Sequence, residues 1–66
     1  MRVSVNGEEM SFPGVTTVAA LVAALELDPR KVAVEKNLEI VPRSTYAQTP
    51  VADGDRFEIV AFIGGG

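Results

Sequence analysis

The chain has 66 residues, 47% of them hydrophobic, and a chain this short buries only about 60% of the surface that its unfolded form exposes. It contains no cysteine and no histidine, which excludes disulfides and Cys/His metal sites, so apolar packing has to hold the fold together. Six basic residues are scattered among nine acidic ones, and the formal charge of −3 argues against a nucleic-acid partner.

The first predicted element is a β-hairpin around Asn6-Gly7. Apolar and polar residues alternate on both sides of this dipeptide, which readily takes the two positive φ values of a type I′ turn. Pro13-Gly14 then ends the second strand. One face of the hairpin carries four apolar side chains: Val3, Val5, Met10 and Phe12.

An α-helix of about ten residues is expected next, in "TTVAALVAALEL". Its apolar residues fall at i, i+3, i+4 and i+7, which is one stripe of a helix: Val18, Leu21, Val22 and Leu25. Thr16 or Thr17 can supply the N-cap oxygen. Because Pro29 disfavours helical geometry at the residue before it, we expect the helix to end near Glu26.

The second half of the chain predicts three further strands. "KVAVEKN" places Val32 and Val34 on one face of a strand, and "EIVP" is a shorter strand that Pro42 confines to an edge. "RSTYAQ" predicts one helical turn that begins at Ser44, and residues 52–55 form a tight turn. The final segment alternates two sets of side chains: Phe57, Ile59, Ala61 and Ile63 against Glu58, Val60 and Phe62. The order indicates an α+β fold in which one helix covers one face of a four- or five-stranded sheet.

Side chains suited to catalysis are scarce. Without His or Cys there is no imidazole base and no thiolate nucleophile. Glu8 and Glu9 are adjacent on a strand and point to opposite faces, so they do not converge on one metal ion. We therefore expect no enzyme activity and no metal or cofactor bound by this chain. No apolar run reaches the ~20 residues of a membrane span, and we expect a cytoplasmic protein without a membrane partner.

The remaining candidate is the glycine tail, residues 64–66, after a domain of residues 1–63. Glycines lack Cβ and form a slim, pliable segment. The four residues from Ile63 onward can extend about 13 Å at roughly 3.3 Å each. Such a tail can enter a narrow channel in another protein and present the Gly66 carboxylate there. The alternative is that the three glycines are a frayed end or a remnant of cloning.

The whole chain resembles the ThiS family, the small sulfur carrier proteins of thiamin biosynthesis, which have the ubiquitin-like β-grasp fold. The resemblance lies in "VNG", "TVAALVAAL", "VAVEKNLEIVPRSTY" and "DGDRFEIVAFIGGG". It implies a mixed sheet with one main helix packed on one face.

The resemblance also implies a reaction cycle. A ubiquitin-activator-like adenylyltransferase (ThiF-type) adenylates the Gly66 carboxylate with ATP, sulfur from a persulfide replaces the adenylate, and a thiazole synthase (ThiG-type) takes the sulfur. In this cycle Gly66 carries the sulfur, Gly64 and Gly65 form the slender arm, and ATP with its magnesium belongs to the partner.

Period 2 in the last strand predicts a docking patch for these partners. If Phe57 and Ile59 face the helix, then Val60 and Phe62 face outward beside Glu58. Aromatic residues tend to dominate interfaces, so this pair is a candidate contact, with Arg43 as a charge at its rim. The alternatives are that residues 44–48 cover the pair or that it forms a homodimer contact. Tyr46 is expected to pack locally.

Other functions remain open at this point. The small subunit of molybdopterin synthase shares the fold, the tail and the adenylation step. A ubiquitin-like modifier that transfers its carboxylate to lysine, and an interaction domain with an inert tail, are further alternatives. The sequence does not identify the sulfur donor, a covalent link to the activator, the partner affinities or the oligomeric state.

Overall fold

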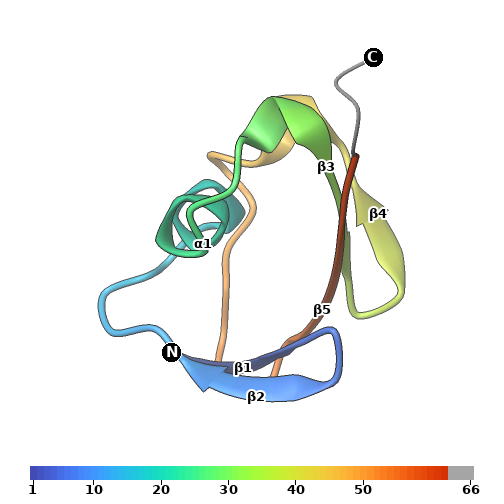
Figure 1. Cartoon of the computed structure of the whole chain (residues 1–66). Helices are drawn as coiled ribbons and strands as arrows, with labels where there is room; N and C mark the ends of the chain where they lie inside the picture. Colours follow the sequence, from blue (N-terminus) through green and yellow to red (C-terminus); the bar gives the residue numbers. More distant parts are fainter. Residues whose placement is uncertain (63–66) are drawn as a thin grey trace.

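The computed structural model of the protein describes residues 1–62. The elements in this range are β1 (Arg2–Val5), β2 (Glu8–Ser11), α1 (Val18–Ala24), the 3₁₀ helix η1 (Pro29–Lys31), β3 (Val32–Lys36), β4 (Glu39–Val41), the 3₁₀ helix η2 (Arg43–Thr45) and β5 (Arg56–Ala61). The strand order is β2-β1-β5-β3-β4. β5 runs parallel to β1 and antiparallel to β3, so the sheet is mixed. Figure 1 shows α1 against one face of this curved sheet, which confirms the predicted α+β class.

The first hairpin forms as predicted. Asn6 and Gly7 have φ values of 52° and 83°, the two positive angles of a type I′ turn. Val3 and Val5 are buried, and Met10 and Phe12 are partly buried against the same core. Alternation along the two strands therefore identified the inner face correctly.

The helix is shorter than predicted. Thr17 is the N-cap, and its hydroxyl accepts a hydrogen bond from the Ala20 N–H at 3.2 Å. The helix has only seven residues and ends at Ala24, not near Glu26.

A Schellman motif, not Pro29, causes this early end. Glu26 adopts φ 60°, its N–H donates to the Ala23 carbonyl, and the Leu27 N–H donates back to the Val22 carbonyl. Pro29 instead starts η1, which Asp28 caps. The prediction failed because it considered only the proline as a stop signal.

The core lies between α1 and the inner face of the sheet. Val18, Leu21 and Val22 of the helix have no exposed surface, as predicted, whereas Leu25 is only partly buried. Phe57 of β5 is the largest of the fully buried side chains. Truncation of such a phenylalanine to alanine costs about 3–5 kcal/mol, so this part of β5 is firmly attached to the domain.

The third and fourth strands form a second hairpin. Val32 and Val34 are buried and β4 is an edge strand, both as predicted. The turn between the strands consists of Asn37 and Leu38, with φ values of 52° and 72°. Asn37, expected at the end of a strand, is a turn residue, because the antiparallel register pairs Lys36 with Glu39.

The segment before β5 closes the other side of the core. The predicted helical turn begins at Arg43 rather than Ser44, with Pro42 at the N-cap position. Tyr46 is buried, and its hydroxyl lies 3.4 Å from the Val32 carbonyl, which confirms its packing role. Gly54, with φ 88°, forms the predicted tight turn. Ile63, predicted to continue the strand, lies outside the described residues.

Candidate functional site

Strand β5 presents alternate side chains to the two sides of the sheet. Phe57 and Ile59 face the helix, and Val60 and Phe62 are 61% and 53% exposed. Glu58 is exposed two residues before Val60. The predicted outward orientation is thus confirmed, and the alternative that residues 44–48 cover Val60 and Phe62 is wrong.

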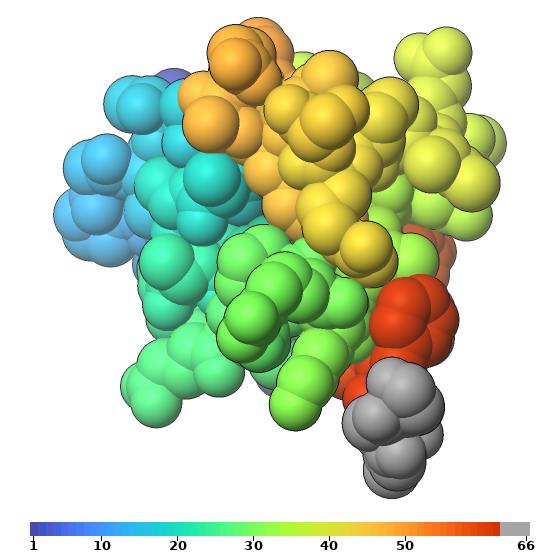
Figure 2. All heavy atoms as spheres, turned by 90° about the horizontal axis from the view of Figure 1, so that it is seen from above, coloured from blue at the N-terminus to red at the C-terminus, as the bar shows by residue number. Residues whose placement is uncertain are grey.

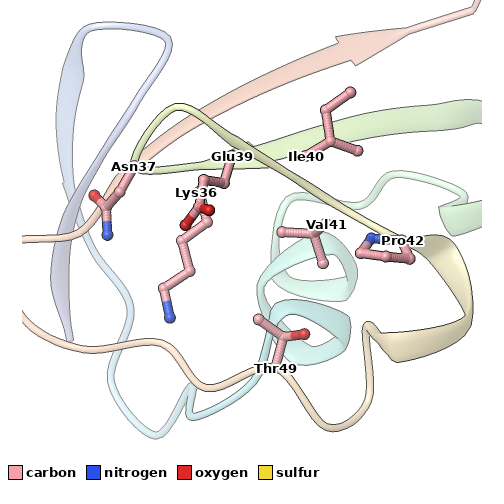
Figure 3. Close-up of a pocket in the computed structure, with 7 residues that line it drawn as sticks. All are labelled: Lys36, Asn37, Glu39, Ile40, Val41, Pro42 and Thr49. Carbon is pink, nitrogen blue, oxygen red and sulfur yellow. The ribbon is translucent and has the colours of Figure 1, made fainter.

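The next two strands of the sheet, β3 and β4, carry further apolar residues on this side. Ala33 of β3 is exposed and pairs with Val60, and Ile40 of β4 is 77% exposed and pairs with Glu35, the next outward residue of β3. Figure 3 shows the Ile40 side chain on the opposite side of β4 from Val41. We call these four residues the outer apolar face: Ala33, Ile40, Val60 and Phe62.

Sequence reasoning missed Ile40. The signal was available, because an inward Val41 places its neighbour on the outer side of the strand. Ile40 lies two strands away from Val60, and its own row across the outer side of the sheet continues with Glu35 and Glu58. No local pattern predicts that strand order.

The structure places Arg43 close to the end of β5. The Arg43 Nε donates to the Pro29 carbonyl at 3.1 Å, and Pro29 begins η1. The last residue of η1 is Lys31, whose carbonyl accepts the Phe62 N–H at 2.7 Å. In Figure 2, η1 in green, the yellow segment that contains η2 and the red end of β5 appear at the same end of the molecule. Arg43 and Phe62 are thus each bound to η1, and the role of Arg43 at a rim stays a prediction.

Two asparagines hold β5 from both sides. Asn6 donates its backbone N–H to the Phe57 carbonyl at 2.8 Å, and its side-chain amide exchanges two hydrogen bonds with the backbone of Ile59, at 2.8 and 3.0 Å. Asn37 repeats this arrangement at the start of β5. Its backbone N–H donates to the Arg56 carbonyl at 2.7 Å, and its Oδ1 accepts the Arg56 N–H at 2.9 Å. These contacts fix the strand that leads to the glycines.

A groove of about 440 Å³ runs along the free edge of β4, and Figure 3 shows the residues that line it. The cationic side chain in this groove, Lys36, is already bound to other parts of the domain. The Lys36 ammonium donates to the Pro50 carbonyl at 2.7 Å and lies 3.7 Å from the Asp55 carboxylate. Partial burial alone would raise the pKa of Asp55, but the Ala52 N–H, the Asn37 amide and the Lys36 charge outweigh it and lower that pKa. We therefore do not take this groove as the site.

Residues 1–62 were also compared with the requirements of a metal site and of a membrane-spanning helix. Between residues 1 and 62, no three carboxylates come close enough to hold a metal ion. No helix in this range has the length and apolarity that crossing a bilayer requires. Gly64, Gly65 and Gly66, the predicted tail and sulfur-carrying residue, lie outside the described residues, and so does the boundary after residue 63. Their roles remain predictions.

Comparison with known proteins gives consistent matches. The ThiS family model matches residues 3–66. A sulfur carrier protein ThiS from Bacillus subtilis is 37% identical over 62 residues, which cover 92% of this chain and 94% of that protein. The crystal structure of a thiamine biosynthesis protein (ThiS) from Geobacter metallireducens superposes with a TM-score of 0.83 at 36% identity, with both chains fully covered.

A longer relative also matches. A thiazole synthase from Paramagnetospirillum magneticum is 62% identical over all 66 residues. This chain spans only 20% of the length of that relative.

Proposed function

Because the chain belongs to the ThiS family and has its ubiquitin-like β-grasp fold, we propose that it carries sulfur for the formation of the thiazole ring of thiamin. The observation that carries the proposal is the family match, which runs through Gly66 and so includes all three glycines. In this proposal the chain is a carrier and not an enzyme, and it works in the cytoplasm.

The chemistry takes place on the main-chain carboxylate of Gly66. One of its oxygens attacks the α-phosphorus of ATP in the activating enzyme, pyrophosphate leaves, and an acyl adenylate forms. The terminal sulfur of a persulfide then attacks the acyl carbon and AMP leaves. A thiol cleaves the sulfur–sulfur bond, is itself oxidised to a disulfide, and leaves the thiocarboxylate on Gly66. Glycine suits this position because the absence of Cβ leaves the carbonyl carbon open to attack.

Two partners take part in this cycle. A ubiquitin-activator-like adenylyltransferase binds ATP and magnesium and receives the tail first, and a thiazole synthase receives the loaded tail afterwards. The thiazole synthase that contains a stretch similar to this chain supports the second partner. Because the chain has to dissociate from each partner in every reaction cycle, we expect interfaces near or below ~1,200 Å².

The domain supports this role through β5. The strand is fixed by Asn6, Asn37 and the buried Phe57, so the residues after Phe62 start from a defined position. The outer apolar face lies beside that starting point. Large apolar side chains as exposed as Val60 and Phe62, at 61% and 53%, are typical of an interaction surface. We propose that both partners contact this face while the tail occupies their active sites.

Intact mass spectrometry of the protein from its native host tests the carrier function. We expect a species heavier by the exchange of one oxygen for sulfur, and fragmentation should localise it to Gly66. A lysine-linked ladder would instead indicate a protein modifier. Unmodified protein under thiamin starvation would overturn the proposal.

Reconstitution with the activating enzyme tests the threading of the tail. One bulky residue appended after Gly66 should abolish ATP–pyrophosphate exchange, while the circular dichroism spectrum stays unchanged. The matched control appends the same residue before Met1. Normal exchange with the extended tail would contradict a narrow channel.

A further inference from the structure

Two cationic residues, Lys31 and Arg43, are connected through η1 to the segment around Phe62. Lys31 is exposed, and its carbonyl binds the Phe62 N–H at 2.7 Å. Arg43 is exposed on η2 and bonded to the Pro29 carbonyl, two residues before Lys31. Through Pro29 and Lys31, η1 therefore links the Arg43 guanidinium to the backbone of Phe62.

Their charges are not paired within residues 1–62. The three ion pairs in this range involve other cations: Arg2 with Glu9, Arg30 with Asp28, and Lys36 with Asp55. Arg30, the remaining cation of η1, is bound to Asp28 through two side-chain hydrogen bonds, at 3.1 and 3.0 Å. In a chain of net charge −3, these two positive charges thus have no ion-pair partner within residues 1–62.

The local geometry prepares Arg43 to bind a carboxylate. Its Nε is occupied by the Pro29 carbonyl, which holds the guanidinium in place. No hydrogen bond within residues 1–62 uses its two terminal nitrogens. A guanidinium held in this way loses less side-chain entropy when a carboxylate binds it.

We propose that Lys31 and Arg43 form a cationic rim that binds acidic side chains at the mouth of the channel into which the activating enzyme takes the tail. This inference rests on the proposed function. The outer apolar face supplies buried contact area, whereas the rim attracts the partner at long range and sets the orientation in which the tail meets the channel. A polyanion such as nucleic acid fits poorly, because Glu35 and Glu58 lie next to each other on the same side of the sheet.

The test compares a double charge reversal at the proposed rim with a single charge reversal on the outer side of the sheet. The double variant Lys31→Glu/Arg43→Glu removes the rim. Arg56→Glu is the control for a charge reversal at this face, because Arg56 is exposed on the same side of the sheet, six residues from Phe62 and about 20 Å away along an extended strand. Circular dichroism first establishes that each variant is folded. Stopped-flow fluorescence then measures the association rate with the activating enzyme, at low salt and at high salt.

We expect the double variant to associate at least about tenfold more slowly at low salt and the control less than about threefold, with the difference shrinking at high salt as charges are screened. The charge-preserving exchange Lys31→Arg/Arg43→Lys should keep the rate within about twofold of the wild-type chain. Equal losses in the double variant and the control, or a loss that salt does not alter, would overturn the rim.

The proposed function can fail separately. If the wild-type chain associates with the expected salt dependence but never acquires sulfur, the proposed rim is supported and the proposed carrier function is wrong. If the wild-type chain does not bind the activating enzyme at all, the proposed rim and the proposed carrier function are both wrong.

Discussion

The two hairpin turns of this protein are built alike and differ at one position. Asn6-Gly7 joins β1 to β2, and Asn37-Leu38 joins β3 to β4. Both asparagines have φ 52°, and both bind the backbone of β5 through their own N–H and their side-chain oxygen. The second residue is a glycine in one turn and a leucine in the other. The sheet thus uses the same device on both sides of its central strand.

The second turn residue accounts for a difference in backbone strain between the two hairpins. Glycine takes φ 83° without a steric penalty, whereas Leu38 at φ 72° carries a Cβ in the left-handed region. Leu38 is also 74% exposed, so burial does not compensate for this strain. Together with Ile40, it makes the second hairpin an apolar projection, while the first is purely a turn.

Removing the Asn6 side chain, which binds the backbone of β5, should lower the stability of the protein the most. Asn6→Ala breaks two part-buried hydrogen bonds to Ile59 and puts alanine at positive φ, and we expect a loss of about 3 kcal/mol in the free energy of unfolding. Urea titration followed by circular dichroism measures it. Asn6→Gly, which relieves only the backbone strain, should recover less than half of the loss. Full recovery would show that the amide contributes little.

The contacts of Asn37 with β5 are more exposed, so their loss should lower the stability less. We expect Asn37→Ala to cost about 1.5–2 kcal/mol, because water replaces part of its contacts with Arg56 and Asp55. The same titration provides the measurement. A loss larger than that of Asn6→Ala would reverse the order that burial predicts.

Introducing leucine into the first turn should reproduce the strain of the second. Gly7→Leu meets no atom within 4 Å of its Cβ, so its cost is conformational, about 1–1.5 kcal/mol. Gly14→Leu, also at positive φ with open space, is a matched control and should cost a similar amount. A neutral result at Gly7 would mean that Leu38 is not strained either.

The reciprocal change should stabilise the protein slightly. Leu38→Gly removes the strain but makes the unfolded chain more flexible, so we expect a gain of about 0.5–1 kcal/mol. Thermal unfolding checks this. A decrease in stability would show that the exposed leucine makes a stabilising contact.

The smallest effect concerns the acid next to Asn37. The pKa of Asp55 is lowered in the folded state, so its stabilisation is present above the unfolded value of about 3.9 and is lost as the pH falls through the lowered pKa. Asp28, whose pKa is lowered to about 2 by hydrogen bonds from the Arg30 side chain and backbone, acts in the same direction. As the pH falls below about 4, the stability of Asp55→Asn should decrease less steeply than that of the wild type. Parallel curves would contradict this assignment.

Local sequence rules predicted the features that depend on neighbours along the chain. The Asn6-Gly7 turn, the cap at Thr17 and the outward orientation of Val60 and Phe62 all follow from φ preferences, capping chemistry and the period of a strand. The same rules failed at Glu26 and Leu38, because both adopt positive φ although nothing in their side chains favours it. Backbone hydrogen bonds across the Schellman motif and the β3–β4 register impose these conformations.

The sequence by itself determined the alternation of faces, the helix start and the family to which the chain belongs, since each is encoded in residues that are close together or in a pattern that the whole chain shares. Only the tertiary structure decided that Ala33 pairs with Val60, that Asn6 and Asn37 both bind β5, and that η1 binds Arg43 through Pro29 and Phe62 through Lys31. Those contacts arise where β5 lies between β1 and β3, which brings together segments that are tens of residues apart. The packing of α1 on the sheet selects this arrangement, because it buries Phe57 and the apolar stripe of the helix together.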